Sequence, residues 1–140
     1  AEDVAKVRPY VDAGGPEKEI VARIFCCPSE DADAVRAAAK RQIAAYLNVP
    51  VYAEFHKWLG RSDDLNGMWN AWESGDRKAA LEAIPDSVVD ELFVHGSPES
   101  CREHIDRYHE NGVTTSAISI MPFAGIDPLQ AARDLSPESR

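Results

Sequence analysis

The sequence predicts an α/β protein whose parallel β-sheet belongs to a larger sheet. Strand-like and helix-like segments alternate along the chain, which is typical of parallel strands joined by right-handed crossovers. The strand-like segments are apolar on both faces, as in a sheet covered on both sides. The chain has 140 residues, of which 44% are hydrophobic and 28% charged, an ordinary composition for one globular domain.

The amino-terminal segment carries an apolar stripe with helical spacing, and Pro9 within it predicts a kink or a break. Residues 20–27 follow as a nearly continuous apolar run, which predicts a strand buried on both faces. Ser29 or Asp31 can then cap a helix that ends before Pro50. Its predicted core stripe consists of Val35, Ala39, Ile43, Tyr46 and Leu47.

Residues 50–85 predict a helical insertion between two strands. Three short amphipathic segments end at Gly60, near Gly75 and at Pro85. The first of them has Tyr52, Phe55, His56 and Leu59 as its apolar stripe. All three tryptophans of the chain also lie in this region.

A short strand is predicted around residues 91–95, followed by a tight turn into a helix. Ser97 is a good N-cap, and Pro98 fits the first helical position, where its missing N–H costs nothing. The buried stripe of this helix is Cys101, Ile105 and Tyr108, and Gly112 ends it. A third strand is predicted at 114–121, and Asp127-Pro128 begins a last helix.

Three strands of this character are too few to form a finished sheet. A parallel sheet needs cover on both faces, and its edge strands need partners. We therefore expect residues 1–140 to be the carboxyl-terminal portion of one (β/α)8 TIM-barrel domain, a fold of about 250 residues. The absence of an initiator Met agrees with a processing or truncation point before Ala1.

The charge and the cysteines limit the partners and the compartment. With 15 basic and 24 acidic residues the net charge is −9, which argues against nucleic acid and against anionic membranes. The longest apolar run, residues 24–28, is far shorter than the roughly 20 residues of a membrane-spanning helix. No secretory signal is visible. The spacing of the three cysteines, Cys26, Cys27 and Cys101, matches no metal site and no disulfide framework. We therefore expect reduced, buried thiols in a cytoplasmic protein.

Residues 88–101 and 108–115 resemble the last β-α units of the luciferase-like monooxygenase family. Residues 45–52 and 69–80 are similar to the helical insertion of its branch that uses the deazaflavin coenzyme F420. Residues 2–9 resemble the helix before the sixth strand, so the chain would hold the last three β-α units of the barrel. No single motif is diagnostic. The order and spacing of the segments carry the resemblance.

The resemblance implies an oxidoreductase or monooxygenase that transfers hydride between a ring cofactor and a small organic substrate. The cofactor would be coenzyme F420, with FMN as the alternative, bound at the carboxyl ends of the strands. Most cofactor contacts of the family come from the first five strands. The chain alone is therefore expected to be inactive, and it holds no assigned catalytic residue and no metal ligand.

Gly96 and Ser97 are the candidate cofactor-binding residues. They lie where a strand ends and a helix begins, so backbone N–H groups and the helix dipole can hold a phosphate or carboxylate. The alternative is a capped turn without a ligand, which Glu99 favours because it already supplies negative charge there.

The candidate substrate-binding residues are His56, Trp72 and His95. His95 ends a strand at the expected mouth of the site, where an imidazole can serve as acid or base, although a structural histidine is the simpler interpretation. His56 and Trp72 could line an aromatic pocket or form the core of the insertion. Arg23 interrupts an apolar strand and should pair with a buried carboxylate or with an anionic ligand group.

A different class of function remains open. The chain could be a complete, non-catalytic α/β binding module that self-associates through its sheet edge. Both interpretations predict a homo-oligomer or an aggregation-prone chain, because an apolar sheet edge would be exposed. The uptake of a flavin or deazaflavin separates the two.

Overall fold

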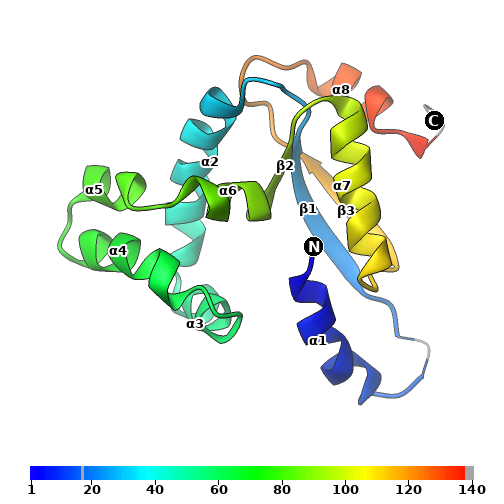
Figure 1. The fold of residues 1–140 in the computed structure, drawn as a ribbon, viewed down its shortest axis with the longest axis horizontal. Coiled ribbons are helices and arrows are strands. Elements are labelled where there is room, and N and C mark those ends of the chain that lie inside the picture. Colours follow the sequence, from blue (N-terminus) through cyan, green and yellow to red (C-terminus); the bar gives the residue numbers. More distant parts are fainter. Residues whose placement is uncertain (17, 138–140) are drawn as a thin grey trace. The chain divides into compact units, whose positions relative to one another are not determined.

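The computed structural model describes residues 1–16 and 18–137, which contain eight α-helices and three β-strands (Figure 1). In chain order the elements are α1 (Asp3–Asp12), β1 (Val21–Cys27), α2 (Ala32–Leu47), α3 (Pro50–Trp58), α4 (Ser62–Glu73), α5 (Arg77–Glu82), α6 (Asp86–Leu92), β2 (Phe93–His95), α7 (Pro98–Glu110), β3 (Thr115–Ile120) and α8 (Pro128–Asp134). No helix among them is both long enough and apolar enough to cross a bilayer.

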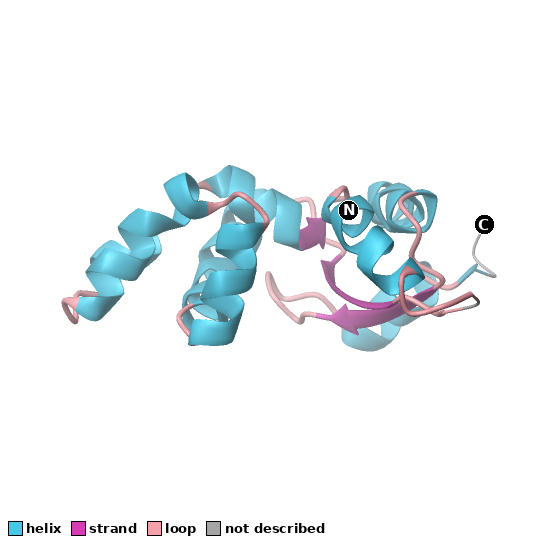
Figure 2. Ribbon diagram, turned by 90° about the horizontal axis from the view of Figure 1, so that it is seen from below, coloured by secondary structure: helices cyan, strands magenta, loops and turns pink. Residues whose placement is uncertain are grey.

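The chain divides into two compact units. Unit 1 consists of Ala1–Val35 and Leu92–Arg140, and unit 2 consists of Arg36–Glu91. All three strands belong to unit 1, whereas the described structure of unit 2 is helical (Figure 2). The three short helices expected within residues 50–85 are present as α3, α4 and α5. That they form an insertion within a barrel domain stays a prediction.

The sheet is parallel, as the alternation of strands and helices predicted, and its order is β2-β1-β3. A (β/α)8 barrel places consecutive strands side by side, so a barrel would require β2 between β1 and β3. The sheet therefore does not have barrel order. The physical reason is that β1 is the most apolar strand, and the central place in a three-stranded sheet gives it a hydrogen-bonded neighbour on each side.

Only part of β1 is buried on both faces, so the prediction for this strand was too broad. Ile24, Cys26 and Cys27 are buried, whereas Val21 is 59% exposed and Arg23 is also exposed. Residues pair in register between parallel strands, and the partner of Val21 on β3 is the exposed Thr115. The amino-terminal half of the sheet thus lacks cover on the face that carries Val21 and Arg23.

The core of unit 1 lies on the opposite face of the sheet. Ile24 and Cys26 of β1 pack with Val94 of β2 and with Cys101 and Ile105 of α7. The partly buried side chains around this cluster are Ala22, Tyr108, Ile118 and Leu135. The predicted stripe of α7 is therefore confirmed, with Tyr108 at its margin.

The ends of α7 follow the predicted local signals. The Ser97 hydroxyl accepts a hydrogen bond from the Ser100 amide at 3.2 Å, and Pro98 occupies the first turn. Gly112 follows the helix with φ of 107°, a backbone conformation that side chains with a Cβ rarely adopt. These residues fix where the polypeptide leaves β2 and enters β3.

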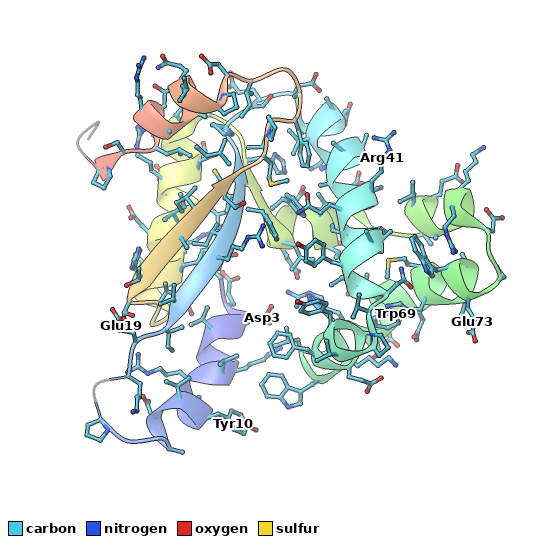
Figure 3. The ribbon with its side chains drawn as sticks, turned by 180° about the vertical axis from the view of Figure 1, so that it is seen from behind. Asp3, Tyr10, Glu19, Arg41, Trp69 and Glu73 are labelled. Atoms are coloured by element: carbon cyan, nitrogen blue, oxygen red, sulfur yellow. The ribbon has the colours of Figure 1, made fainter. Side chains whose placement is uncertain are left out.

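Of the kink or break expected at Pro9, the break is wrong, because α1 continues through it from Asp3 to Asp12, and the kink stays a prediction. Proline removes one N–H donor from the helical ladder, yet the Pro9 carbonyl still accepts from the Ala13 amide at 3.1 Å. No residue of α1 is fully buried, and Tyr10 points away from the helix into solvent (Figure 3). The Arg8 side chain links α1 to the turn after α7, because it donates to the Gly112 carbonyl at 3.3 Å.

Within α2, the cap and most of the stripe agree with the sequence. The Asp31 carboxylate accepts from the Ala34 amide at 3.0 Å, as an N-cap does. Tyr46 is the exception, since it is 40% exposed while Ala44 is buried in its place. Position 44 lies on the same helical face as Leu47, and its small side chain permits closer packing there.

The strand expected around residues 91–95 begins only at Phe93, because residues 86–92 form α6. Val88 and Val89 are buried as helical residues. Two ion pairs join α6 to α2 within unit 2. Arg36 donates two hydrogen bonds to Asp90, at 2.9 and 2.7 Å, and Lys40 lies 2.7 Å from Asp86. These charge-assisted contacts hold α6 against α2.

Candidate functional site

The carboxyl ends of the three strands meet at one edge of the sheet. Cys27 at the end of β1 pairs in register with His95 at the end of β2. The Met121 amide, just beyond β3, donates to the Cys26 carbonyl at 2.8 Å. In parallel α/β folds this edge carries the ligand site, because strand ends and following loops converge there.

A row of aromatic rings runs from this edge onto the sheet face opposite the core. The rings of Phe25 and Phe93 are stacked with centroids 5.2 Å apart, and Phe123 follows at 6.2 Å from Phe93. We call Phe25, Phe93 and Phe123 the phenylalanine row. Phe93 is 2% exposed, whereas the outer two rings are half-buried. Only the two outer rings of the row are therefore partly accessible.

A guanidinium group extends the row at its far end. The Cζ atom of Arg23 lies 4.7 Å from the centroid of the Phe25 ring. Arg23 was expected to pair with a buried carboxylate or with an anionic ligand group; it is exposed and has no ion pair among residues 1–16 and 18–137, so the carboxylate alternative is wrong and the ligand alternative stays a prediction. A cation–π contact of this kind contributes about 0.5–1 kcal/mol at an exposed site. The positive charge remains available to an anion.

The backbone and side-chain groups of the β2–α7 turn form hydrogen bonds within the protein. Gly96 has φ of 118°, and its amide donates to the Ser29 carbonyl at 3.0 Å. The Ser97 hydroxyl caps α7 and lies 3.1 Å from the Ser100 hydroxyl. The Gly96 amide is thus engaged within the protein, and the role of Gly96 and Ser97 toward a phosphate stays a prediction.

His95 shares the sheet face of the phenylalanine row. Phe93 and His95 are two residues apart on β2, so their side chains point the same way. The imidazole is half-buried. Its position at the carboxyl edge is where the sequence placed it.

The other two predicted substrate contacts lie in unit 2. His56 is 8% exposed and lies on the buried side of α3 with Ala53. The Trp72 ring is covered on one face by the Arg77 guanidinium, whose Cζ atom lies 3.8 Å from the ring centroid. Arg77 also donates to the Trp72 carbonyl at 2.5 Å. His95 belongs to unit 1, so the three predicted substrate contacts are divided between the two units.

The three thiols are buried, as predicted, and none is in a disulfide. A hydrogen bond with Cys101 and burial raise the pKa of the Cys26 thiol, and burial raises that of Cys27. The Cys27 thiol lies 3.7 Å from the Phe123 carbonyl, to which it donates. A raised pKa disfavours the thiolate, the form that attacks electrophiles and binds metals. No group of three or more His, Cys, Asp or Glu residues in the described structure could hold a metal ion.

The sequence did not single out the phenylalanine row. One signal was present, since Arg23, Phe25 and Cys27 alternate along β1, and Phe93 and His95 do so along β2. Phe123 could not be assigned to the row, because it lies in the loop after β3 and reaches Phe93 only through the fold.

These features define an α/β protein with an open parallel sheet that carries aromatic and imidazole groups toward its carboxyl edge and a guanidinium group farther along the same face. The sequence model of the luciferase-like monooxygenase family matches residues 1–115, and the chain belongs to this family. Membership indicates an oxidoreductase or monooxygenase. Neither the curated proteins nor the solved structures contain a match to the chain.

Proposed function

We propose that this chain is the carboxyl-terminal part of a luciferase-like oxidoreductase that transfers hydride between a ring cofactor and a small organic substrate. The cofactor is coenzyme F420 or FMN. The observation that carries the proposal is the family match over residues 1–115, together with the phenylalanine row at the edge where parallel sheets bind ligands.

The residues present fit such a cofactor. When bound, a flavin or deazaflavin ring supplies the hydride chemistry. The partly exposed Phe25 and Phe123 rings can contact a planar ring, and the exposed Arg23 guanidinium can pair with a phosphate or carboxylate. Gly96 and Ser97 would support the anionic part from the β2–α7 turn. Their preformed hydrogen bonds hold that turn in one conformation before any ligand arrives.

The substrate contacts are proposed at His95, His56 and Trp72. His95 lies on the face of the row and can donate or accept a proton at one ring nitrogen. His56 and Trp72, the other two proposed contacts, belong to unit 2. Because His56 is 8% exposed, a substrate reaches its imidazole only if the side chain becomes more exposed.

A barrel is proposed for the whole domain, with residues 50–85 as an insertion within it. That arrangement requires β2 between β1 and β3, so the β1–β3 pairing of the described structure would have to be replaced. The open sheet supports only the addition of further strands, since the outer edges of β2 and β3 pair with no strand among the described residues. Further strands of the same protein could pair there.

The test is cofactor uptake by the protein expressed from its natural reading frame. We expect a visible absorbance band of flavin or deazaflavin in the purified protein. Arg23→Ala should weaken cofactor binding about tenfold, the loss of one charge-assisted hydrogen bond. The exposed Arg41 offers the matched control, and Arg41→Ala should leave binding unchanged. A colourless protein that binds neither cofactor would favour the non-catalytic module.

A further inference from the structure

A serine and a histidine meet at the amino-terminal end of the sheet, away from the carboxyl edge that carries the candidate site. Ser116 is the second residue of β3, and His109 lies in the last turn of α7, which packs beside β3 (Figure 1). The Ser116 Oγ atom lies 3.0 Å from the Nε2 atom of the His109 ring. A hydroxyl at hydrogen-bond distance from an imidazole is the arrangement in which a serine becomes a nucleophile.

A backbone carbonyl determines which nitrogen of the His109 ring carries the proton. The Nδ1 atom lies 3.0 Å from the Val113 carbonyl oxygen. Because a carbonyl oxygen only accepts hydrogen bonds, Nδ1 is the protonated nitrogen and donates to it. In the neutral imidazole Nε2 is then bare, so it accepts from the Ser116 hydroxyl. The ring therefore faces the serine as a base, and the Val113 carbonyl has the orienting role of the third member of a catalytic triad.

The turn that ends α7 fixes this geometry. The Gly112 amide donates to the His109 carbonyl at 3.0 Å, and the Val113 amide donates to the Tyr108 carbonyl at 3.0 Å. These are the two hydrogen bonds of a Schellman motif, and Gly112, with φ of 107°, takes its left-handed position. The carbonyl that orients the histidine thus belongs to a turn with one defined conformation.

Strand pairing holds the serine, and the pair is open to solvent. Ser116 pairs in register with Ala22 of β1, and the Thr114 amide donates to the Ile20 carbonyl at 3.0 Å. Ser116 is half-buried and His109 is exposed, so a small molecule can reach both. The last carbonyl groups of a helix favour a positive charge beside them. They therefore favour the imidazolium that forms when His109 takes a proton.

We infer that Ser116 is a nucleophile for small carboxylic esters, with His109 as its general base. The Ser116 Oγ atom attacks the carbonyl carbon of the ester while His109 Nε2 takes the hydroxyl proton. The bond from the acyl carbon to the leaving oxygen breaks, the proton passes from Nε2 to that oxygen, and the acyl group stays on Oγ. Water then attacks the acyl carbon and gives a proton to Nε2. The carboxylic acid leaves, and the proton returns to Oγ.

The inference is independent of the proposed oxidoreductase activity, since the family match covers residues 1–115 and does not include Ser116. Turnover should be slow, because a carbonyl stabilises the imidazolium less than the carboxylate of a full triad does. The covalent product on the serine is therefore a more sensitive readout than turnover. The half-buried hydroxyl limits the ester to a small acyl group.

The test is labelling with a fluorophosphonate of the protein expressed from its natural reading frame. In this reaction the serine oxygen bonds to phosphorus and fluoride leaves, so the product is stable and adds one phosphonyl group. Peptide mapping by mass spectrometry should place that group on Ser116. Ser74 is a control within the same molecule, because it is exposed and its hydroxyl donates to the Ala71 carbonyl at 2.9 Å. It should stay unmodified.

Three variants separate the roles of the two residues. Ser116→Ala should abolish labelling at this position. His109→Gln should lower the labelling rate of Ser116 at least about 100-fold, the lower end of what a general base contributes. The matched control is Ser119→Ala on the same strand, since the Ser119 hydroxyl contacts the Met121 sulfur at 4.0 Å, and this variant should label at the wild-type rate. Far-UV circular dichroism checks the fold of each variant.

An ester provides a second, independent measurement. 4-Nitrophenyl acetate should acetylate Ser116 and release about one equivalent of nitrophenolate in a burst, the kinetic sign of an acyl-enzyme. The burst should persist in Ser119→Ala and disappear in Ser116→Ala.

Three results would overturn the inference. The first is a wild-type protein in which Ser116 takes up neither the phosphonyl nor the acetyl group. The second is labelling of Ser116 that His109→Gln leaves unchanged, since the serine would then react without a base. The third is equal labelling of Ser74, which would mean that the reagent modifies exposed hydroxyls without selection.

Discussion

Phe93→Leu tests whether the phenylalanine row holds unit 1 together. Phe93 is the central ring and is 2% exposed, so the substitution removes two ring contacts while keeping a buried apolar side chain. Each aromatic pair contributes about 0.5–1.5 kcal/mol beyond its buried area, and the change of shape adds less than about 1.5 kcal/mol. We therefore expect a loss of about 2–3 kcal/mol in the free energy of unfolding.

Urea unfolding measures this loss, and the chain supplies a separate probe for each unit. All three tryptophans lie in unit 2, at positions 58, 69 and 72. Their fluorescence reports unit 2, while far-UV circular dichroism reports the whole chain. The midpoint of the dichroism transition should fall by roughly 1 M urea. If the fluorescence midpoint stays in place, the two units unfold separately.

The control is Leu129→Ala, which alters a 71% exposed apolar residue of unit 1 and should change stability by less than about 0.5 kcal/mol. A double-mutant cycle with Phe123→Leu should give a coupling of about 0.5–1.5 kcal/mol to Phe93. The reasoning fails if Phe93→Leu costs no more than the control, or if the two substitutions are additive.

Three further predictions concern α7 and its ends. Burial, with a smaller effect of the Arg107 charge, lowers the pKa of His104 to about 4. The unfolded chain therefore binds this proton more tightly than the folded chain, and the free energy of unfolding should fall as the pH drops from about 6.5 to 4. His104→Gln should flatten that decline in thermal melts, and an unchanged decline would contradict the assignment. Ser97→Ala removes the cap of α7 and should cost about 1 kcal/mol in urea unfolding, whereas no loss would mean that the cap is dispensable. Gly112→Ala places a Cβ on a residue with φ of 107° and should cost about 1–2 kcal/mol by the same assay, and a neutral result would place the turn in another conformation.

Local signals in the sequence predicted the boundaries that depend on a few adjacent residues. Ser97 with Pro98 begins α7, Gly112 follows its end, and Asp127 caps α8, each as expected. Such signals act through hydrogen bonds within one turn of the chain, so they do not depend on the rest of the fold. The parallel sheet was predictable for a similar reason, since alternating strands and helices leave few other arrangements.

The order of the strands could not be predicted from these patterns, because it depends on which pairing buries the most apolar surface. The same limit applies to α3. Tyr52, Phe55 and His56 all fit one apolar stripe at helical spacing, yet Tyr52 and Phe55 are exposed. The spacing of apolar residues along α3 does not say which of its faces the neighbouring helices cover. The phenylalanine row required contacts between residues far apart in the chain, which no local pattern records.

The β3 strand has a consequence for handling the protein. Its sequence, Thr-Ser-Ala-Ile-Ser-Ile, contains no charged residue and no proline, the two features with which natural edge strands block unwanted pairing. A foreign strand could therefore hydrogen-bond along its outer side and lengthen the sheet, so β3 is the segment where intermolecular β-augmentation would start. One lysine placed at the exposed Ala117 would act as a gatekeeper without touching the core.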